Sequence, residues 1–454
     1  MRRSTVNPVS FRADVVVVGS GPGGATLTRE LARAGKKVLL LERGTDQRRR
    51  AYYGTYLGAL LYTDRGSLLF SEEGLNIIRP LMLGGATSMF CGCAAVPPPW
   101  LKAKYGIDLD DETAETIDEL DIQPLPEELR GRASTRIAQI GISMGQDWRP
   151  MPVFKRPGRV QQFDCGAKCM LGCRCGAKWN AAEFVDEATT IGAELRTSAR
   201  VERVLIEDGH AVGVEGRLGR RRFEARADTV VLSAGGIGTA SILRASGWKE
   251  AGDGIAMDTT AIVYGFTNEE GTGGEPPMSW FWEDPERGYM LSALIDPWLL
   301  YPLMAGLKSV RHSLRWPSWN RALGVMIKLK DEVSGGLLTD GKISKPLTET
   351  DGLKLTAAEQ LSRRILVQAG ADPETIFTTP LRGTHPSATV RIGHLLDLNL
   401  QTEIKGLYAC DASTFPEALG QPTVLTIIGL AKRLAKHLIG ADSIHEKRHA
   451  SRQA

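Results

Sequence analysis

Four glycines near the N-terminus, Gly19, Gly21, Gly23 and Gly24, have the spacing of a phosphate-binding turn. They follow a run of valines at residues 15–18 and precede a helix-like segment at residues 26–34. A glycine permits the tight turn at position 19, lets backbone approach a pyrophosphate at position 21, and allows close helix–strand packing at position 24. A pyrophosphate would then rest on the N–H groups and the positive dipole end of the helix.

An acidic residue follows the second apolar run of this unit. Residues 38–41 form that run, and Glu42 and Arg43 come directly after it. A carboxylate at this place is expected to bind the ribose of a dinucleotide, and it would repel a 2′-phosphate. The stretch therefore predicts NAD or FAD binding, with both cofactors left open.

A second segment whose residues could carry out chemistry is rich in cysteine. Four of the seven cysteines, Cys165, Cys169, Cys173 and Cys175, lie within residues 165–175. Thiolates at this density suit an iron–sulfur cluster or a structural zinc ion. The spacing matches neither the common ferredoxin pattern nor a zinc finger, so a cluster, zinc, and free or redox-active thiols all remain open.

Regular elements must position these residues. A second strand–glycine-turn–helix unit spans residues 229–245, and two such units are typical of a doubly wound α/β sheet. From about residue 255 to 380 alternating segments such as 324–329 predict antiparallel strands of a separate, substrate-facing domain. The apolar run 290–304 is either buried core or an exposed patch that rests on membrane or admits an apolar substrate.

Composition excludes several classes of function. The chain has 454 residues, enough for two or three domains, and a net charge of +3, too small to indicate nucleic-acid binding. It holds no apolar run of 18 residues and no signal-peptide h-region, so no membrane-spanning helix and a cytoplasmic location are expected, with any membrane association peripheral. Cysteines without a secretory signal favour a reducing compartment.

Nearly the whole chain resembles the glucose–methanol–choline (GMC) oxidoreductases, which are FAD-dependent. The resemblance rests on the glycine turn ending in residues 41–44, the loop Gly84-Gly85-Ala86-Thr87, and residues 232–239. It rests most on the closing block, a His-Pro pair at His385, residues 408–416, and the helix after Pro422.

The resemblance implies roles for individual residues. His385 matches the family's active-site histidine, which would take the hydroxyl proton of an alcohol while hydride leaves for flavin N5. Gln421 stands where the family usually has His or Asn, and its amide can position a substrate oxygen. Pro422 is predicted at the first position of the last helix, whose N-terminus would face the flavin.

Expected FAD contacts extend beyond the glycine turn. They are Gly19, Gly21, Gly23, Gly24, Glu42, Arg43, Gly84, Gly85, Thr87, Val204, Ala234, Gly235, Asp411, Ala412, Pro422 and Thr423. Family members often attach FAD covalently through a histidine in the loop after Gly85. Met89 occupies that neighbourhood here, so noncovalent FAD is expected.

These inferences combine into one predicted enzyme. The fold is α/β, with a discontinuous Rossmann-type FAD domain (residues 1–254 and 381–454) and an inserted α+β antiparallel-sheet substrate domain (residues 255–380). The predicted activity is oxidation of a CH–OH group in a small, preferably hydrophobic molecule, with a quinone or a carrier protein as electron acceptor. Two alternatives stay open: a flavin and iron–sulfur enzyme acting on a C–C bond, and a non-catalytic flavin or thiol redox sensor.

Overall fold

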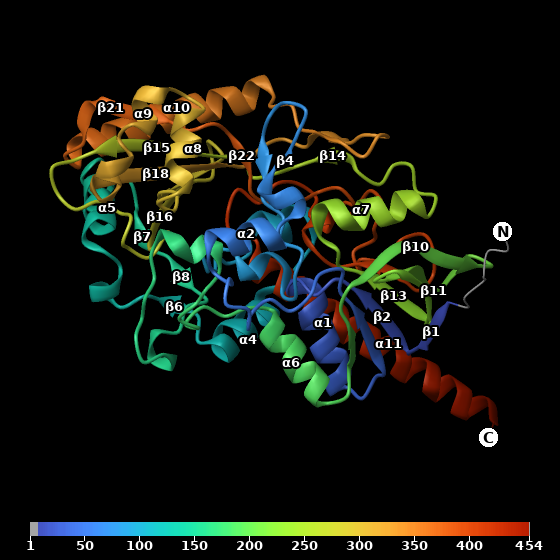
Figure 1. Cartoon of the computed structure of the whole chain (residues 1–454). Helices are drawn as coiled ribbons and strands as arrows, with labels where there is room; N and C mark the ends of the chain where they lie inside the picture. The colour runs from blue at the N-terminus through green and yellow to red at the C-terminus, as the bar shows by residue number, and fades with distance from the viewer. Residues whose placement is uncertain (1–7, 454) are drawn as a thin grey trace.

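The computed structural model describes residues 8–453, and a five-stranded parallel sheet lies at the centre of one half (Figure 1). Its order is β23-β13-β2-β3-β9. The strands are β2 (Val15–Val18), β3 (Val38–Leu41), β9 (Glu194–Arg196), β13 (Thr229–Leu232) and β23 (Leu407–Ala409). All residues of β2 and β3 are buried, because helix α1 (Pro22–Arg33) contacts one face of the sheet and a second sheet packs on the other.

That second sheet has four strands in the order β1-β12-β11-β10. They are β1 (Val9–Arg12), β10 (Ala199–Glu207), β11 (His210–Leu218) and β12 (Arg221–Arg226). Helices α6 (Ala182–Thr190) and α11 (Val424–Gln453) flank α1, while α7 (Gly235–Ala245) contacts β10. The result is the doubly wound α/β half that the two glycine turns predict.

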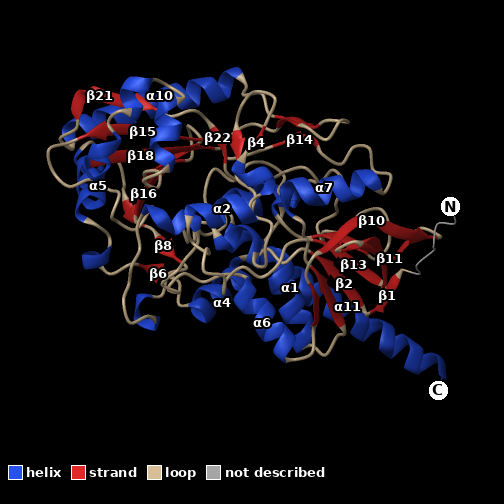
Figure 2. Cartoon of the chain, in the orientation of Figure 1, coloured by secondary structure: helices blue, strands red, loops and turns tan. Residues whose placement is uncertain are grey.

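A larger, mostly antiparallel sheet forms the other half of the molecule (Figure 2). Its order is β4-β5-β22-β15-β18-β17-β16-β7, with β21 paired to β15. The strands are β4 (Leu69–Phe70), β5 (Asn76–Ile77), β7 (Arg149–Pro150), β15 (Thr260–Phe266), β16 (Trp280–Asp284), β17 (Tyr289–Ala293), β18 (Ala322–Leu329), β21 (Asp372–Thr378) and β22 (Arg382–Gly383). Strand β18 pairs antiparallel with β15 and β17, which confirms the strand predicted at 324–329.

Helices cover this sheet and short elements join the two halves. Helix α10 (Glu349–Gln368) contacts β15, β17 and β18, and α5 (Arg132–Ser143) packs beside it. The remaining helices are α2 (Tyr56–Tyr62), α3 (Pro99–Tyr105), α4 (Asp110–Leu120), α8 (Leu300–Gly306) and α9 (Val310–Ser313). The remaining strands are β6 (Gln123–Pro124), β8 (Pro152–Val153), β14 (Asp253–Ile255), β19 (Ser334–Leu337) and β20 (Ile343–Ser344).

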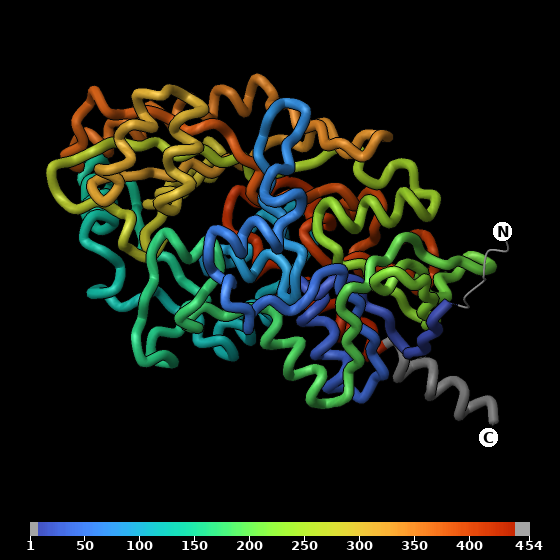
Figure 3. The backbone as a smooth tube through the Cα atoms, viewed as in Figure 1, coloured from blue at the N-terminus to red at the C-terminus, as the bar shows by residue number. Residues whose placement is uncertain are grey.

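Segments distant in sequence meet between the halves. In Figure 3 the blue tube that follows β3 passes through the centre of the molecule. There β5 pairs in parallel with β22, so residues 76–77 lie beside residues 382–383. Strands β4, β5 and β7 thus come from the first expected segment, 1–254, but join the antiparallel sheet. The division into 1–254, 255–380 and 381–454 remains our proposal for the domains.

Two helix starts differ from the sequence expectation. Helix α1 begins at Pro22 rather than near Thr26, because the carbonyl of Gly21 already accepts a hydrogen bond from Ala25 N–H (2.9 Å). Helix α11 begins at Val424, so the prediction of Pro422 at its first position is wrong. The carbonyl of Thr423 accepts the bond from Ile427 N–H (3.1 Å), which leaves Pro422 outside the helix.

The sequence predicts no membrane-spanning segment. Within residues 8–453, no helix has the length and apolar character needed to cross a bilayer. The apolar run 290–304 divides in two. Its β17 part is buried, whereas Trp298, Leu299 and Leu303 are exposed.

Candidate active site and cysteine pocket

A cavity of about 590 Å³ opens at the carboxyl ends of β2, β3 and β13. Open α/β sheets bind their ligands at this end, where the turns after the strands leave a crevice. The sequence-predicted residues that line the cavity are Gly19, Gly21, Gly23, Glu42, Arg43, Gly85, Ala234, Gly235, His385, Asp411, Ala412 and Thr423. The fold thus brings three separate stretches of the chain around one cavity.

The glycine turn has the shape that the sequence predicts. Gly19 has φ +100°, a left-handed conformation that glycine adopts without strain. A Cβ on Gly24 would overlap the carbonyl oxygen of Gly19, which confirms close packing of α1 against the turn. A Cβ on Gly21 would meet no protein atom within 4 Å, although the residue lines the cavity. Backbone is therefore open to a ligand at position 21.

The N-terminus of α1 is equipped to hold an anion. Its N-cap, Gly21, has no side chain to accept a bond from the first N–H groups, and its first turn contains no acidic residue. Helix α7 also begins at the cavity, but its first N–H group, that of Gly235, already donates to the carboxylate of Asp411. The free N–H groups and the positive dipole end of α1 suit a pyrophosphate. The residues present therefore fit a flavin dinucleotide in this cavity.

Two carboxylates at the cavity already have protein partners. Glu42 accepts bonds from Ser20 N–H (2.9 Å), the Ser20 hydroxyl (2.6 Å) and Gly44 N–H (2.7 Å). Asp411 accepts from Gly235 N–H (2.8 Å) and the Thr239 hydroxyl (2.5 Å), and burial raises the pKa of its carboxyl. Both side chains fix the turns that surround the cavity.

Several predicted cofactor residues lie behind the cavity wall. Gly24, Gly84, Thr87, Val204 and Pro422 do not line it. Gly84 N–H donates to the Ser20 hydroxyl (3.1 Å), and the Thr87 hydroxyl donates to the Gly84 carbonyl (2.5 Å). Val204 N–H donates to the Ser246 hydroxyl (2.8 Å), while Val201 on the same strand reaches the cavity. These residues support the residues that line the cavity.

His385 has a partner that sequence reasoning missed. Its Nδ1 lies 2.7 Å from Oδ2 of Asp258, whose side chain is almost completely buried (1% exposed). The imidazole keeps 26% of its own surface exposed and lines the cavity. A carboxylate on Nδ1 fixes one tautomer and leaves Nε2 as the nitrogen free to accept a proton. The pair is a candidate general-base dyad.

Asp258 is held in an uncommon backbone conformation. Its φ is +46°, a region that a non-glycine residue occupies at a cost of about 1–3 kcal/mol. The carboxylate of Asp331 accepts bonds from the N–H groups of Met257 and Thr259 (3.1 and 3.2 Å) and so stabilises this turn. Strain that the surroundings maintain at a buried acid is typical of a functional position.

A buried lysine lies close to the dyad. The ammonium of Lys328 donates to the hydroxyls of Thr384 (2.7 Å) and Thr260 (3.3 Å). Burial lowers the pKa of Lys328. Burial is the largest cause that lowers the pKa of His385, and the charge of Lys328 is the second. Together they outweigh Asp258, which raises this pKa. Neutral imidazole, the form a base requires, is therefore favoured near pH 7.

Gln421 lies beside the dyad but is turned to the protein. Its side-chain amide donates to the carbonyl of Val96 (2.5 Å), and the residue does not line the cavity. Its neighbour Gly420 donates its N–H to Oδ1 of Asp258 (2.8 Å). Gln421 is thus connected to Asp258 through the backbone of Gly420, and its role toward substrate remains a prediction.

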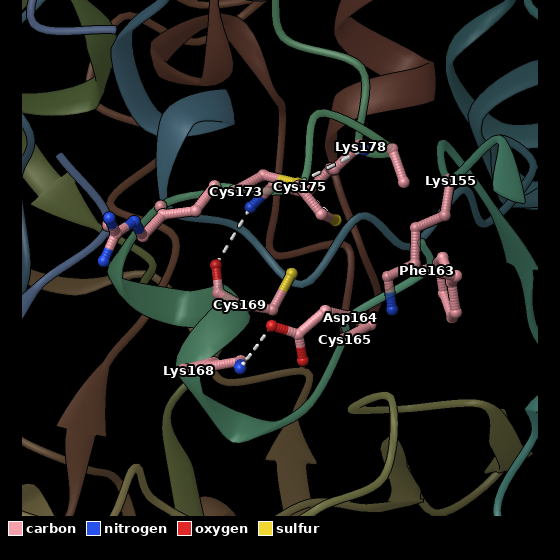
Figure 4. Close-up of a pocket in the computed structure, with 13 residues that line it drawn as sticks. Lys155, Phe163, Asp164, Cys165, Lys168, Cys169, Cys173, Cys175 and Lys178 are labelled. Carbon is pink, nitrogen blue, oxygen red and sulfur yellow. Dashed lines mark hydrogen bonds and ion pairs between the residues drawn. The ribbon is translucent and has the colours of Figure 1, made fainter. Parts of the chain in front are cut away.

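All four clustered cysteines line a second, separate cavity of about 200 Å³ (Figure 4). Cys173 Sγ lies 3.7 Å from Cys175 Sγ, and Cys165 hydrogen-bonds to Cys169. Two buried lysines, Lys155 and Lys178, line the same cavity. The bond from Cys165 and the two ammonium groups hold the pKa of Cys169 well below its ordinary value.

Residues that follow the cysteines bind the loop 84–90 beside the first cavity. The ammonium of Lys178 donates to the carbonyls of Phe90 (2.6 Å) and Cys169 (3.1 Å), and Asn180 donates to the Ser88 hydroxyl (2.9 Å). Among the residues whose side chains the structure describes, 8–440, no group of three or more His, Cys, Asp or Glu side chains is arranged to hold a metal ion. The sulfur positions therefore do not fit a metal centre, and the predicted cluster remains a prediction.

The fold and the first cavity are those of a dinucleotide-binding α/β protein, with a histidine in the wall of the cavity. Comparison with known proteins gives the same class. The sequence model of the FAD binding domain matches residues 12–53, and that of the GMC oxidoreductases matches residues 143–259. These matches support placing the chain with the GMC oxidoreductases, which are FAD-dependent enzymes.

Individual relatives agree with this placement. An uncharacterised protein of Methanocaldococcus jannaschii is 25% identical over 94% of this chain and 100% of its own length. An uncharacterised GMC-type oxidoreductase of Mycobacterium tuberculosis is 31% identical over 59% of this chain, and this match spans 45% of that protein. A long-chain-alcohol oxidase of Arabidopsis thaliana is 23% identical over 97% of this chain and 69% of its own length.

A solved structure supports the fold. Pyridoxine 4-oxidase from Mesorbium loti superposes with a TM-score of 0.67 at 14% sequence identity, covering 93% of this chain and 98% of that one. At this identity the likeness concerns the fold alone.

Proposed function

We propose that this protein oxidises a CH–OH group with His385 as general base. The observation that carries the proposal is the 2.7 Å contact between Nδ1 of His385 and the buried carboxylate of Asp258. This contact would direct Nε2 of a neutral imidazole to the substrate. Nε2 would then accept the hydroxyl proton as the C–H bond breaks. Asp258 stabilises the imidazolium that this transfer creates.

FAD supplies the hydride acceptor when it is bound. The N-terminus of α1 would hold its pyrophosphate, and Gly21 and Gly85 would allow backbone to approach it. Among the described residues that line this cavity, His385 is the only histidine, and the proposal assigns it to proton transfer. We therefore propose noncovalent FAD. Acid precipitation of the holoenzyme should release the yellow chromophore into the supernatant.

An alcohol is the proposed substrate class. The similarity to a long-chain-alcohol oxidase supports this choice. The frequent aromatic and apolar residues of the expected substrate segment, 255–380, lead us to propose a hydrophobic alcohol rather than a sugar. The electron acceptor is proposed to be a quinone or a carrier protein.

The proposal is tested by following flavin reduction without oxygen. His385→Ala should retain FAD but lose substrate-driven reduction by about 10²-fold or more, because the base is gone. His394→Ala is the matched control, because His394 is an exposed histidine in the same region. Unchanged reduction in His385→Ala would exclude this base. Flavin that no alcohol reduces in the native enzyme would favour the C–C bond or sensor alternatives.

A second candidate function belongs to the cysteines. Four thiols line one cavity, and Lys178 links their segment to the loop at the flavin cavity. We propose that this site exchanges electrons with an external partner through its thiols. Iron and acid-labile sulfide in anaerobically purified protein would distinguish the cluster from thiols.

A further inference from the structure

The two short helices α8 and α9 present an apolar face to solvent. The exposed side chains are Leu299 (39%), Leu303 (67%), Leu307 (67%), Val310 (71%) and Leu314 (75%), and we call them the leucine face. Single exposed leucines are common on proteins, but a contiguous series of them marks an interaction site.

The spacing of the leucine face explains why it is one surface. Leu299, Leu303 and Leu307 lie four residues apart and project from one side of α8. The opposite side, with Tyr301, Met304 and Ala305, is buried in the core. Tyr301 also fixes α9, because its hydroxyl donates to the carbonyl of His312 (2.8 Å). Helix α8 therefore has one side in the core and the other in solvent, and α9 is held beside it by Tyr301.

Helix α2 lies next to this surface and extends it. The Tyr56 hydroxyl accepts a hydrogen bond from Leu299 N–H (3.0 Å), which joins α2 to the start of α8. Leu57, Leu60 and Leu61 of α2 are 56–59% exposed, while Gly58, Ala59 and Tyr62 on its other side are buried. Two elements more than 200 residues apart in sequence thus contribute exposed leucines to neighbouring positions.

Cations lie between the exposed leucines, and the acidic Glu359 of α10 lies close enough to Lys308 to interact with it. Residues 297–330 contain no Asp or Glu, whereas Lys308 and Arg311 between the exposed leucines are themselves exposed. Trp298 and Trp316 pack on each other beside them, with ring centroids 4.5 Å apart. Exposed leucines, interspersed cations and amphipathic indole rings are the combination found at membrane–water interfaces.

We propose that the leucine face docks the enzyme on an anionic lipid bilayer surface. The leucines would enter the headgroup–acyl boundary while Lys308 and Arg311 contact lipid phosphates. A second copy of this chain is a poorer occupant, because a two-fold contact would bring like cations together across the interface. Docking goes beyond the proposed oxidation and does not depend on it.

Vesicle co-sedimentation of the holoenzyme tests the proposal. The native protein should bind phosphatidylcholine vesicles that contain phosphatidylglycerol, and bind pure phosphatidylcholine vesicles more weakly. Leu303→Glu combined with Leu307→Glu should lower binding by about tenfold or more, because apolar area that enters the lipid is lost. Leu353→Glu is the matched control, because Leu353 is also 68% exposed but lies on α10. Lys308→Glu with Arg311→Glu should remove the preference for anionic vesicles.

Three outcomes would overturn the proposal. They are native protein that binds neither vesicle type, equal loss of binding in the Leu353→Glu control, and a dimer in solution that Leu303→Glu with Leu307→Glu dissociates. The last would assign the leucine face to a second copy. Flavin absorbance and flavin reduction of the variants in detergent-free buffer show that they remain folded. Failure of docking would leave the oxidation proposal untouched.

Discussion

Asp258 and His385 are 127 residues apart in the chain, yet Oδ2 of one lies 2.7 Å from Nδ1 of the other. The contact crosses from the turn before β15 to the segment after β22, and the backbone is paired there as well, since His385 N–H donates to the carbonyl of Met257 (2.8 Å). Position and tautomer of the proposed base are thus set together.

Asp258→Asn should lower the rate of flavin reduction by about 10- to 100-fold while FAD remains bound. The amide cannot stabilise an imidazolium, and its NH₂ group can turn toward Nδ1 and change the tautomer. Stopped-flow reduction measures this effect. In Asp258→Asn/His385→Ala the two losses should not add, because both residues act through one proton transfer. If the two losses added in full, Asp258 and His385 would act independently and not as a dyad.

The pH profile should report the lowered pKa of His385. A base is active when deprotonated, so flavin reduction should fall only as the pH drops below the ordinary histidine value of about 6.5. Lys328→Met removes a positive charge that lowers this pKa, so the acid limb should move to higher pH. A limb that stays in place or moves to lower pH would show that Lys328 does not act on the base.

Two alanine substitutions in the glycine turn should separate folding from cofactor binding. Gly23→Ala places a Cβ against the carbonyl oxygen of Cys410, so it should lower the free energy of unfolding by about 1–3 kcal/mol. Gly21→Ala meets no protein atom, so the apoprotein should keep its stability and lose FAD affinity. Thermal unfolding of apoprotein and FAD titration measure the two effects. If Gly21→Ala lowered the stability of the apoprotein as much as Gly23→Ala, position 21 would not be open to a ligand.

Elemental analysis should show whether the cysteine cavity holds an iron–sulfur cluster or metal-free thiols. If the site holds a cluster, anaerobic preparations will contain iron and sulfide, and Cys169→Ser will remove both without releasing FAD. If the thiols are metal-free, Cys169 should react fastest with an alkylating reagent, because its pKa is lowered well below that of an ordinary thiol. Cys410→Ser is a control, because burial raises the pKa of Cys410.

Local sequence was enough to determine the cofactor half. Strand, glycine turn and helix follow one another at residues 15–33 and again at 229–245, and such signals depend on neighbours in the chain. The same signals placed Gly19, Gly21 and Gly235 at the cavity. The start of α11 was misplaced, because Pro422 suits a helix start but the first helical bond goes to Thr423.

Tertiary structure alone decided the rest. Asp258, Lys328 and Asp331 carry no motif, and each acquires its role from a contact with a distant segment. The apolar run 290–304 could not be divided by hydropathy into a buried strand and an exposed helix face, because burial depends on what packs against each side. The sequence therefore determined which cofactor fold forms, and packing between distant segments determined which acid contacts His385 and which leucines reach solvent.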